Sequence, residues 1–197
     1  CYLRVEKGEV VIRCSPLFSQ SEIEKLIRNH QEEILEQIKG YVPKYNYQED
    51  GYVYLFNQKY QIVLKDMNIK KCAIHDRQIY VYSKNIQATT EMFLKQELMN
   101  YLKERIDFYL STSFHHVFPE IQIKKMKRRW GACFYQKNRV CFNLVLAHID
   151  YALIDYVIVH ELCHFLEANH SKAFYHEIEK RMPDYKERER LLKDVGI

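Results

Sequence analysis

Residues 155–171, DYVIVHELCHFLEANHS, decide how this sequence is interpreted. They contain the pattern H-E-x-x-H, formed by His160, Glu161 and His164. Positions four apart on a helix lie on one face, so the two imidazoles can each offer one ring nitrogen to a single Zn²⁺ ion. Glu161 lies beside the pair, where its carboxylate can take a proton from a metal-activated water as a general base. The stretch therefore predicts a helix that carries a catalytic zinc site.

A third histidine completes the predicted ligand set. His170 follows six residues after His164, too far along a straight helix to share its face at the same height. The helix must therefore end or turn. Asn169 tolerates the left-handed conformation of a helix terminus, and Ser171 can cap a following helix. Glu167 is the alternative third ligand, because it lies one turn beyond His164; as a non-ligand it could hydrogen-bond a ligand imidazole.

Length and composition limit the number of domains, the class of partner and the location of the protein. A chain of 197 residues fits one domain, or a core domain with a small appendage. Its net charge of +4 argues neither for nor against nucleic acid. The six cysteines form no C-x-x-C pair, and a chain this long needs no disulfide framework, so we expect reduced thiols and a cytoplasmic location. There is no apolar run of about eighteen residues and no signal-peptide core, so the sequence predicts no membrane segment.

The beginning of the chain reads as strands followed by a helix. Alternating apolar residues predict two short strands over residues 2–14, around Gly8. A single helix should then run from a cap at Ser19 or Ser21 to about Ile38.

Two β-hairpins are expected next. One covers residues 52–64 and turns at Asn57-Gln58, and the other covers residues 71–82 and turns at Asp76-Arg77. Their many tyrosines could form a groove that stacks bases or side chains. Strand propensity explains them more simply.

The second half contains the longest predicted helix, residues 89–112, which should back the metal-site helix. A strand over residues 121–126 overlaps the one strong basic run, residues 124–129. A further β-hairpin follows, with strands at 130–135 and 140–144.

Three helices should close the chain. The metal-site helix is predicted from its cap at Asp150 to about Ala168. A second covers residues 171–181, and a charged terminal helix follows Pro183.

Several segments accompany the metal motif in a distinctive order. They are RWGAC at 129–133, Asn143, IDYVIVHELCH at 154–164, NHS at 169–171, FY at 174–175 and PDY at 183–185. In this order and spacing the sequence resembles the YgjP-like metallopeptidase family of small prokaryotic zincins. The resemblance is strong over residues 121–185, and the strand–helix–strand order of the N-terminal half agrees with it.

Two positions depart from the family pattern. Ala132 replaces a serine, which removes a hydrogen bond, and Tyr175 stands where the family usually has tryptophan. The metal motif also resembles the metzincin pattern H-E-x-x-H-x-x-G-x-x-H, but Glu167 occupies the glycine position, so the metzincin turn is not assumed.

The resemblance implies an α+β, zincin-like fold. A small mixed or antiparallel sheet should pack on the H-E-x-x-H helix and on a long backing helix, with additional strands and a helix at the N-terminus. We divide the chain into an N-terminal portion, residues 1–85, packed on a catalytic core, residues 86–197.

The resemblance also assigns roles to residues. It implies His160, His164 and His170 as zinc ligands and Glu161 as catalytic base, in agreement with the helix spacing. Arg129 could bind a carboxylate or phosphate or stabilise an oxyanion, or it could serve only as a structural ion pair or a solvated charge.

Three neighbours of these residues should serve packing. Trp130 should pack beside the metal-site helix, with Gly131 permitting a close backbone approach. Tyr175 and Tyr185 could donate to an oxyanion, but core packing is the expected role of each.

Three functions fit these features. The first is a zinc-dependent peptidase, in which an exposed strand edge at residues 121–127 or in the following hairpin binds an extended, acidic or unfolded polypeptide. The second is implied by the resemblance, because some YgjP-like proteins have been assigned UTP pyrophosphatase activity: a metal-dependent nucleotide pyrophosphatase, with the basic run on the phosphates. The third is a non-catalytic nucleic-acid-binding module with structural zinc.

Overall fold

The computed structural model describes residues 1–6, 9–40, 45–67 and 69–196. It contains two compact units, unit 1 (Cys1–Asn46) and unit 2 (Tyr47–Ile197). The division of the chain into an N-terminal portion, residues 1–85, and a catalytic core, residues 86–197, stays a prediction. Residues 47–85 belong to unit 2 by their contacts.

Unit 1 begins with a β-hairpin, as the alternating pattern predicts. Its antiparallel strands are β1 (Tyr2–Glu6) and β2 (Glu9–Arg13). The predicted turn at Gly8 lies outside the described residues. The strand register brings Cys1 opposite Cys14, and the two form a disulfide. The expectation of reduced cysteines is therefore wrong for this pair, because the hairpin juxtaposes two thiols that are distant in sequence.

Two helices follow where one was predicted. They are α1 (Gln20–Asn29) and α2 (Gln31–Gly40). Ser19 begins α1 with a capping box that includes Glu22. The single-helix prediction is wrong because the helix breaks at His30. There the backbone N–H bonds back to the carbonyl of Ile27, only three residues earlier, and the imidazole bonds to Glu33 at 3.2 Å.

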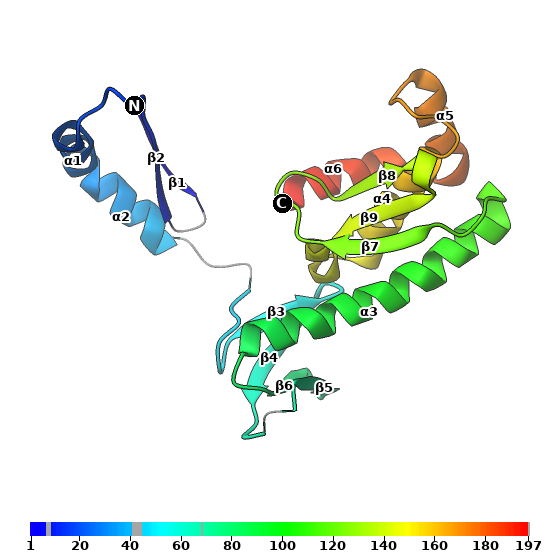
Figure 1. The fold of residues 1–197 in the computed structure, drawn as a ribbon, viewed down its shortest axis with the longest axis horizontal. Helices are drawn as coiled ribbons and strands as arrows, with labels where there is room; N and C mark the ends of the chain where they lie inside the picture. Colours follow the sequence, from blue (N-terminus) through cyan, green and yellow to red (C-terminus); the bar gives the residue numbers. More distant parts are fainter. Residues whose placement is uncertain (7–8, 41–44, 68, 197) are drawn as a thin grey trace. The chain divides into compact units, whose positions relative to one another are not determined.

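Unit 2 begins with a four-stranded sheet (Figure 1). In spatial order its strands are β3 (Tyr52–Leu55), β4 (Gln58–Leu64), β6 (Gln78–Tyr82) and β5 (Lys71–His75). Both predicted hairpins are confirmed, and β4 runs parallel to β6. The second turn lies at Asp76-Arg77 as predicted. The first lies at Phe56-Asn57, one residue early, where both residues have positive φ.

A three-stranded sheet forms the other part of unit 2. In spatial order its strands are β7 (Glu120–Lys124), β9 (Arg139–Asn143) and β8 (Gly131–Phe134). β9 runs parallel to β7 and antiparallel to β8, so β8 is an edge strand. Because β7 ends at Lys124, most of the basic run lies in the loop between β7 and β8 rather than in a strand.

The long backing helix is confirmed. Helix α3 (Ile86–Tyr109) continues into a short π-helical turn, and it runs along both sheets in Figure 1. Its buried face repeats every four residues, through Leu94, Leu98, Leu102 and Ile106.

The H-E-x-x-H helix is the most buried helix of unit 2 in the described part of the chain. Three helices close the chain, α4 (Tyr151–Cys163), α5 (Lys172–Arg181) and α6 (Tyr185–Val195). Asp150 caps α4 and Ser171 caps α5 through their side chains, as predicted. Every residue from Leu153 to Val159 is buried, which explains the unbroken apolar run.

Helix α4 ends earlier than predicted. It stops at Cys163 rather than at about Ala168, because the N–H groups of Phe165 and Leu166 bond back only three residues. The predicted class is nevertheless confirmed: the fold is α+β, with a small mixed sheet on the H-E-x-x-H helix. None of the helices in the described part of the chain has the length and apolarity of a membrane span.

A buried ionic cluster fixes α4 against α3. Asp155 lies within the apolar run of α4 and accepts bonds of 3.0 and 2.7 Å from Arg105. Tyr101 and Tyr109 donate to the same carboxylate at 2.8 and 3.1 Å. A buried carboxylate needs such partners, and the isolated acid in an apolar run was the sequence signal for them.

We expect Asp155→Asn to lower the free energy of unfolding by about 3 kcal/mol, because it leaves the largely buried Arg105 without its counter-charge. Urea denaturation measures the change. Asp184→Asn is the matched control, because it removes a more exposed partner of Arg188 and should cost less than about 1 kcal/mol. Equal losses in the two variants would contradict the role assigned to Asp155.

Candidate metal centre

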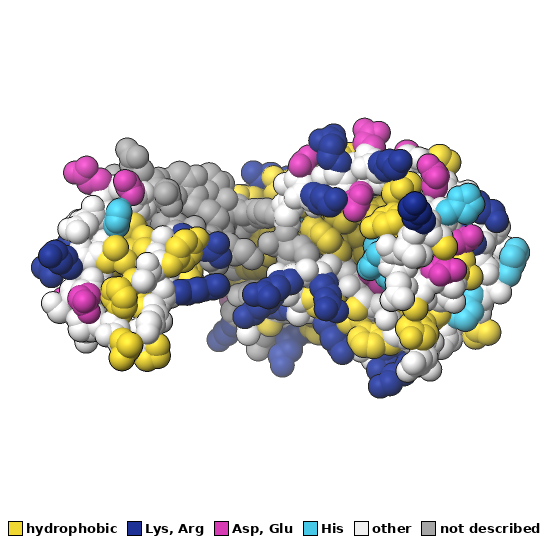
Figure 2. Space-filling view, turned by 90° about the horizontal axis from the view of Figure 1, so that it is seen from above, with side chains coloured by type: hydrophobic (Ala, Val, Ile, Leu, Met, Phe, Trp, Pro, Cys, Tyr) yellow, Lys and Arg dark blue, Asp and Glu magenta, His cyan; other side chains and the backbone are white. Residues whose placement is uncertain are grey.

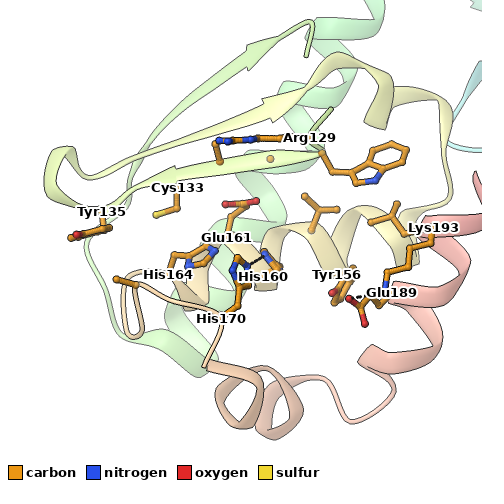
Figure 3. A pocket seen from close by; sticks show the side chains of 16 residues that line it. Arg129, Cys133, Tyr135, Tyr156, His160, Glu161, His164, His170, Glu189 and Lys193 are labelled. Atoms are coloured by element: carbon orange, nitrogen blue, oxygen red, sulfur yellow. Dashed lines mark hydrogen bonds and ion pairs between the residues drawn. The ribbon is translucent and has the colours of Figure 1, made fainter. Parts of the chain in front are cut away.

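Three imidazoles converge at the end of α4. His160 lies in the last turn of α4, His164 is the residue that caps its C-terminus one turn further on, and His170 returns to them from the segment that follows (Figure 3). One ring nitrogen from each lies within 4.8 Å of the others, and the Nε2 atoms of His160 and His170 are 3.0 Å apart. Tetrahedral zinc with Zn–N bonds of about 2.1 Å needs ligand nitrogens about 3.4 Å apart. The three histidines therefore fit one such ion.

The turn after α4 brings His170 back. The backbone carbonyl of Glu167 lies 3.2 Å from Nδ1 of His164, which fixes both the turn and the ring. The predicted left-handed residue is wrong, because Asn169 has a negative φ and the turn after Cys163 redirects the chain instead. Glu167 contributes its backbone, and its carboxylate is not part of the three-histidine group.

Burial favours the neutral form of His160 and His164, which is the form that binds a metal. Burial lowers the pKa of His160 to about 3, with a smaller effect from His164 and His170. Burial also lowers the pKa of His164, although the hydrogen bond to the backbone of Glu167 acts in the opposite direction and raises it. Nδ1 of His160 is buried without a hydrogen-bond partner.

Glu161 is a buried carboxylate between α4 and the edge strand. Only 5% of its surface is exposed, and burial raises its pKa to about 8. The backbone N–H of Cys133 donates to it, and this bond and the charge of Arg129 oppose the shift. A Cβ atom at Gly131 would lie 2.5 Å from Oε1 of Glu161. The close approach predicted for Gly131 is confirmed, and it is made to this carboxylate.

Asn143 holds the basic loop over the centre. Its side chain is fully buried, donates to the carbonyls of Met126 and Arg129 at 2.8 Å each, and accepts from the N–H of Met126 at 3.2 Å. Arg129 projects along the β8 side of the cleft near Glu161 (Figure 3). The side chain of Lys125 instead pairs with Glu91 of α3 at 2.6 Å.

These residues share a cleft of about 590 Å³. One wall is β8 with Arg129 and Trp130, the floor is α4, and α6 closes the far end. The sequence analysis missed the contribution of α6, whose cleft residues are Glu189, Leu192 and Lys193. Tyr175 and Tyr185 do not line the cleft and pack against each other, with ring centroids 6.1 Å apart.

The family model of the YgjP-like metallopeptidase domain matches residues 1–195. The chain belongs to the YgjP-like metallopeptidase family. Membership implies a hydrolase that uses a divalent metal and acts on polypeptides, and the converging histidines supply a place for the ion. The match includes unit 1, so the hairpin and its two helices are part of the family domain.

Two solved metallopeptidase zymogens are similar to part of the chain. Abylysin of Pyrococcus abyssi is 17% identical, with a TM-score of 0.44, over 48% of this chain and 94% of abylysin. Jannalysin of Methanocaldococcus jannaschii is 24% identical, with a TM-score of 0.42, over 48% of this chain and 96% of jannalysin. No curated protein matches the chain.

The raised pKa of Glu161 predicts a stability that falls with pH in the metal-free protein. In the unfolded chain this carboxyl loses its proton near pH 4.5, whereas in the folded protein it keeps the proton to about pH 8. Its stabilising effect is therefore lost as pH rises between these values. The lowered pKa of His160 acts oppositely: it stabilises the folded protein increasingly as pH rises, and this effect is nearly complete about one pH unit above its unfolded pKa of 6.5.

Between pH 6.5 and 8 we expect the free energy of unfolding to fall by about 1 kcal/mol. Each pH unit is worth about 1.4 kcal/mol per proton, but folded Glu161 begins to lose its proton as pH approaches 8, and the unfolded histidines still lose theirs just above pH 6.5. Urea denaturation in the presence of a chelator measures this, and Glu161→Gln should remove the decline. The same decline in both proteins would show that another group causes it.

Proposed function

We propose that this protein is a zinc-dependent peptidase in which His160, His164 and His170 hold the ion and Glu161 is the general base. The observation that carries the proposal is the convergence of three imidazoles beside one buried carboxylate in an open cleft. Three protein ligands leave a position for water, which distinguishes catalytic from structural zinc sites.

When bound, zinc would supply Lewis acidity that polarises the scissile carbonyl and lowers the pKa of a water. Glu161 is the group that accepts the proton of the attacking water and later delivers it to the leaving amine. A carboxyl that can hold a proton near neutral pH suits both halves of this transfer. Its bond from Cys133 and the absence of a side chain at Gly131 keep the carboxylate in place.

An extended peptide is proposed to bind along the free edge of β8 rather than along the edge of β7. The N–H of Asn143 bonds to the carbonyl of Trp130 at 2.8 Å, so even-numbered residues of β8 face β9. The outward backbone groups belong to Gly131 and Cys133. The N–H of Cys133 already donates to Glu161, which leaves the two carbonyls and the N–H of Gly131 for hydrogen bonds to the substrate backbone.

Arg129 is proposed to act on the substrate rather than only on the fold. It is exposed in the cleft, its backbone is held by Asn143, and its charge reaches Glu161. The guanidinium can donate to a substrate carbonyl or carboxylate. With Lys127 and Arg128 in the same loop, it would favour acidic segments of an unfolded polypeptide.

The other hypotheses have less support. The pairing of Lys125 with Glu91 removes one cation from a phosphate or nucleic-acid surface, and the family is one of peptidases. A cytoplasmic location stays a prediction, and the Cys1–Cys14 bond speaks against it, because such bonds persist in oxidising compartments.

We expect the zinc-loaded protein to cleave an unfolded polypeptide with fluorophore and quencher labels, and Glu161→Gln to reduce kcat by about 1,000-fold while zinc stays bound. The matched control is Glu167→Gln, which changes a neighbouring carboxylate outside the three-histidine group. This variant should retain kcat within a few-fold. Product analysis by mass spectrometry confirms peptide hydrolysis.

The same proteins should be incubated with nucleoside triphosphates. Release of pyrophosphate by the zinc-loaded protein, with no peptide cleavage, would contradict the proposal. Equal peptide cleavage by the original protein and Glu161→Gln would remove Glu161 from the mechanism.

A further inference from the structure

The four-stranded sheet of unit 2 has two faces, and α3 covers one of them. Side chains alternate between the faces of a strand, and the pairing of β3, β4, β6 and β5 shows which residues share a face. The inward side chains that are buried are aliphatic, among them Val53, Ile62 and Ile79. The thiol of Cys72, also inward, lies 3.7 Å from the backbone carbonyl of Thr89 on α3 (Figure 1). The other face of the sheet looks away from α3.

Tyrosines are gathered on this outward face. Tyr52 and Tyr54 of β3 and Tyr80 and Tyr82 of β6 all point to it, and each is half-buried. The rings of Tyr52 and Tyr54 meet edge to face, with centroids 6.1 Å apart. Strand propensity favours tyrosine without regard to the face, so it does not explain why the outward side is aromatic and the buried side aliphatic. Partly exposed rings in a row offer flat surfaces on which nucleic-acid bases can stack.

Lysines lie among these rings. The Nζ atom of Lys59 is 4.1 Å from the centroid of the Tyr52 ring, and that of Lys65 is 4.8 Å from the centroid of the Tyr80 ring. Lys71 of β5 is exposed on the same face. Each ammonium group is therefore held close to an aromatic surface, where it can meet the phosphate of a nucleotide whose base stacks nearby.

The polar side chains of the outward face also suit nucleic acid. No outward residue of the four strands is an aspartate or a glutamate; Asp50, Asp66 and Asp76 lie in the segments that join or precede the strands. Two outward amides, Gln61 and Gln78, are paired across β4 and β6, and amides can hydrogen-bond the edges of unpaired bases. An acidic peptide would use the lysines but not the rings, whereas each nucleotide brings both a base and a phosphate.

We propose that this outward face binds single-stranded nucleic acid, with bases stacked on the rings and phosphates against the ammonium groups. We call it the tyrosine face, formed by Tyr52, Tyr54, Tyr80, Tyr82, Lys59 and Lys65. None of these residues lines the cleft of the metal centre. The tyrosine face thus differs from the surface beside that centre, where Figure 2 shows lysine and arginine side chains next to a hollow that contains a histidine. Binding to the tyrosine face therefore requires neither a metal nor peptidase activity.

The first test measures binding of the full chain to a short fluorescein-labelled single-stranded RNA by fluorescence anisotropy. We expect an affinity that falls as salt rises, that is at least about tenfold weaker for the matching duplex, whose base faces are hidden, and that a chelator leaves unchanged. Absence of binding, or equal binding of single strand and duplex, would overturn the proposal. Loss of binding with the chelator would place the ligand at the metal centre instead, and equal competition by a polyglutamate peptide would assign the face to acidic polypeptides.

Tyrosine variants then assign the binding to the sheet. Tyr82→Leu should weaken single-strand binding about tenfold, because it removes one stacking ring, whereas Tyr82→Phe keeps the ring and should retain the original affinity. The matched control is Tyr135→Leu, which changes a tyrosine of unit 2 that is 50% exposed and lies outside this sheet. Its affinity should equal that of the original protein. Unchanged affinity in Tyr82→Leu, or an equal loss in Tyr135→Leu, would contradict the inference.

A lysine variant tests the phosphate contacts without disturbing the fold. Lys65 is exposed, so Lys65→Ala leaves the core of the sheet intact. The slope of log affinity against log salt should become shallower by about 0.7, the contribution of one phosphate contact to a single strand. Lys127→Ala, an exposed lysine of the basic loop between β7 and β8, is the matched control and should keep the original slope. A slope that changes only in Lys127→Ala would move the binding site to the basic loop and overturn the inference.

Discussion

The contact between the Glu161 carboxylate and the backbone of β8 is the constraint on which the centre depends. It joins the edge strand to the helix that carries two of the histidines, and it tolerates no side chain at Gly131. A carboxylate held this deeply would be costly without its N–H donor. Around this contact the helix supplies the imidazoles, the strand supplies a free edge, and α6 supplies a wall.

The rigidity of this arrangement comes from buried polar groups outside the centre. Asp155 ties α4 to α3 through Arg105, and Asn143 ties the basic loop to the end of β9. Both lie one layer behind the reacting groups. Polar residues that satisfy each other in a low-dielectric interior specify one geometry more strictly than apolar packing does, and a hydrolytic centre needs that geometry before substrate arrives.

Much of this was readable from the sequence because it depends on local spacing. The i, i+4 histidines, the caps at Asp150 and Ser171 and the turn at Asp76-Arg77 follow from helix and turn geometry. The end of α4 was placed too late because no proline or glycine marks it. Its signal is instead the bond between His164 and a carbonyl that only the folded turn presents.

What could not be read depends on contacts between distant segments. Leu192 lines the cleft only because α6 packs against α4. In the sequence it is one leucine of a charged helix, and nothing there shows which cavity it borders. Likewise, Cys1 and Cys14 meet through the hairpin register, which two isolated cysteines in a sequence do not specify. Tertiary register, not residue type, decides such pairs.

The central claim is that three histidines and no carboxylate hold the metal next to Glu161. A crystal structure of the zinc-loaded full chain, with anomalous data at the zinc edge, tests it most directly. We expect one ion with nitrogen ligands from His160, His164 and His170 at about 2.1 Å, and Glu161 close by but not bound to it. An ion coordinated by the Glu167 carboxylate in place of His170, or by the sulfur of Cys133, would contradict the account.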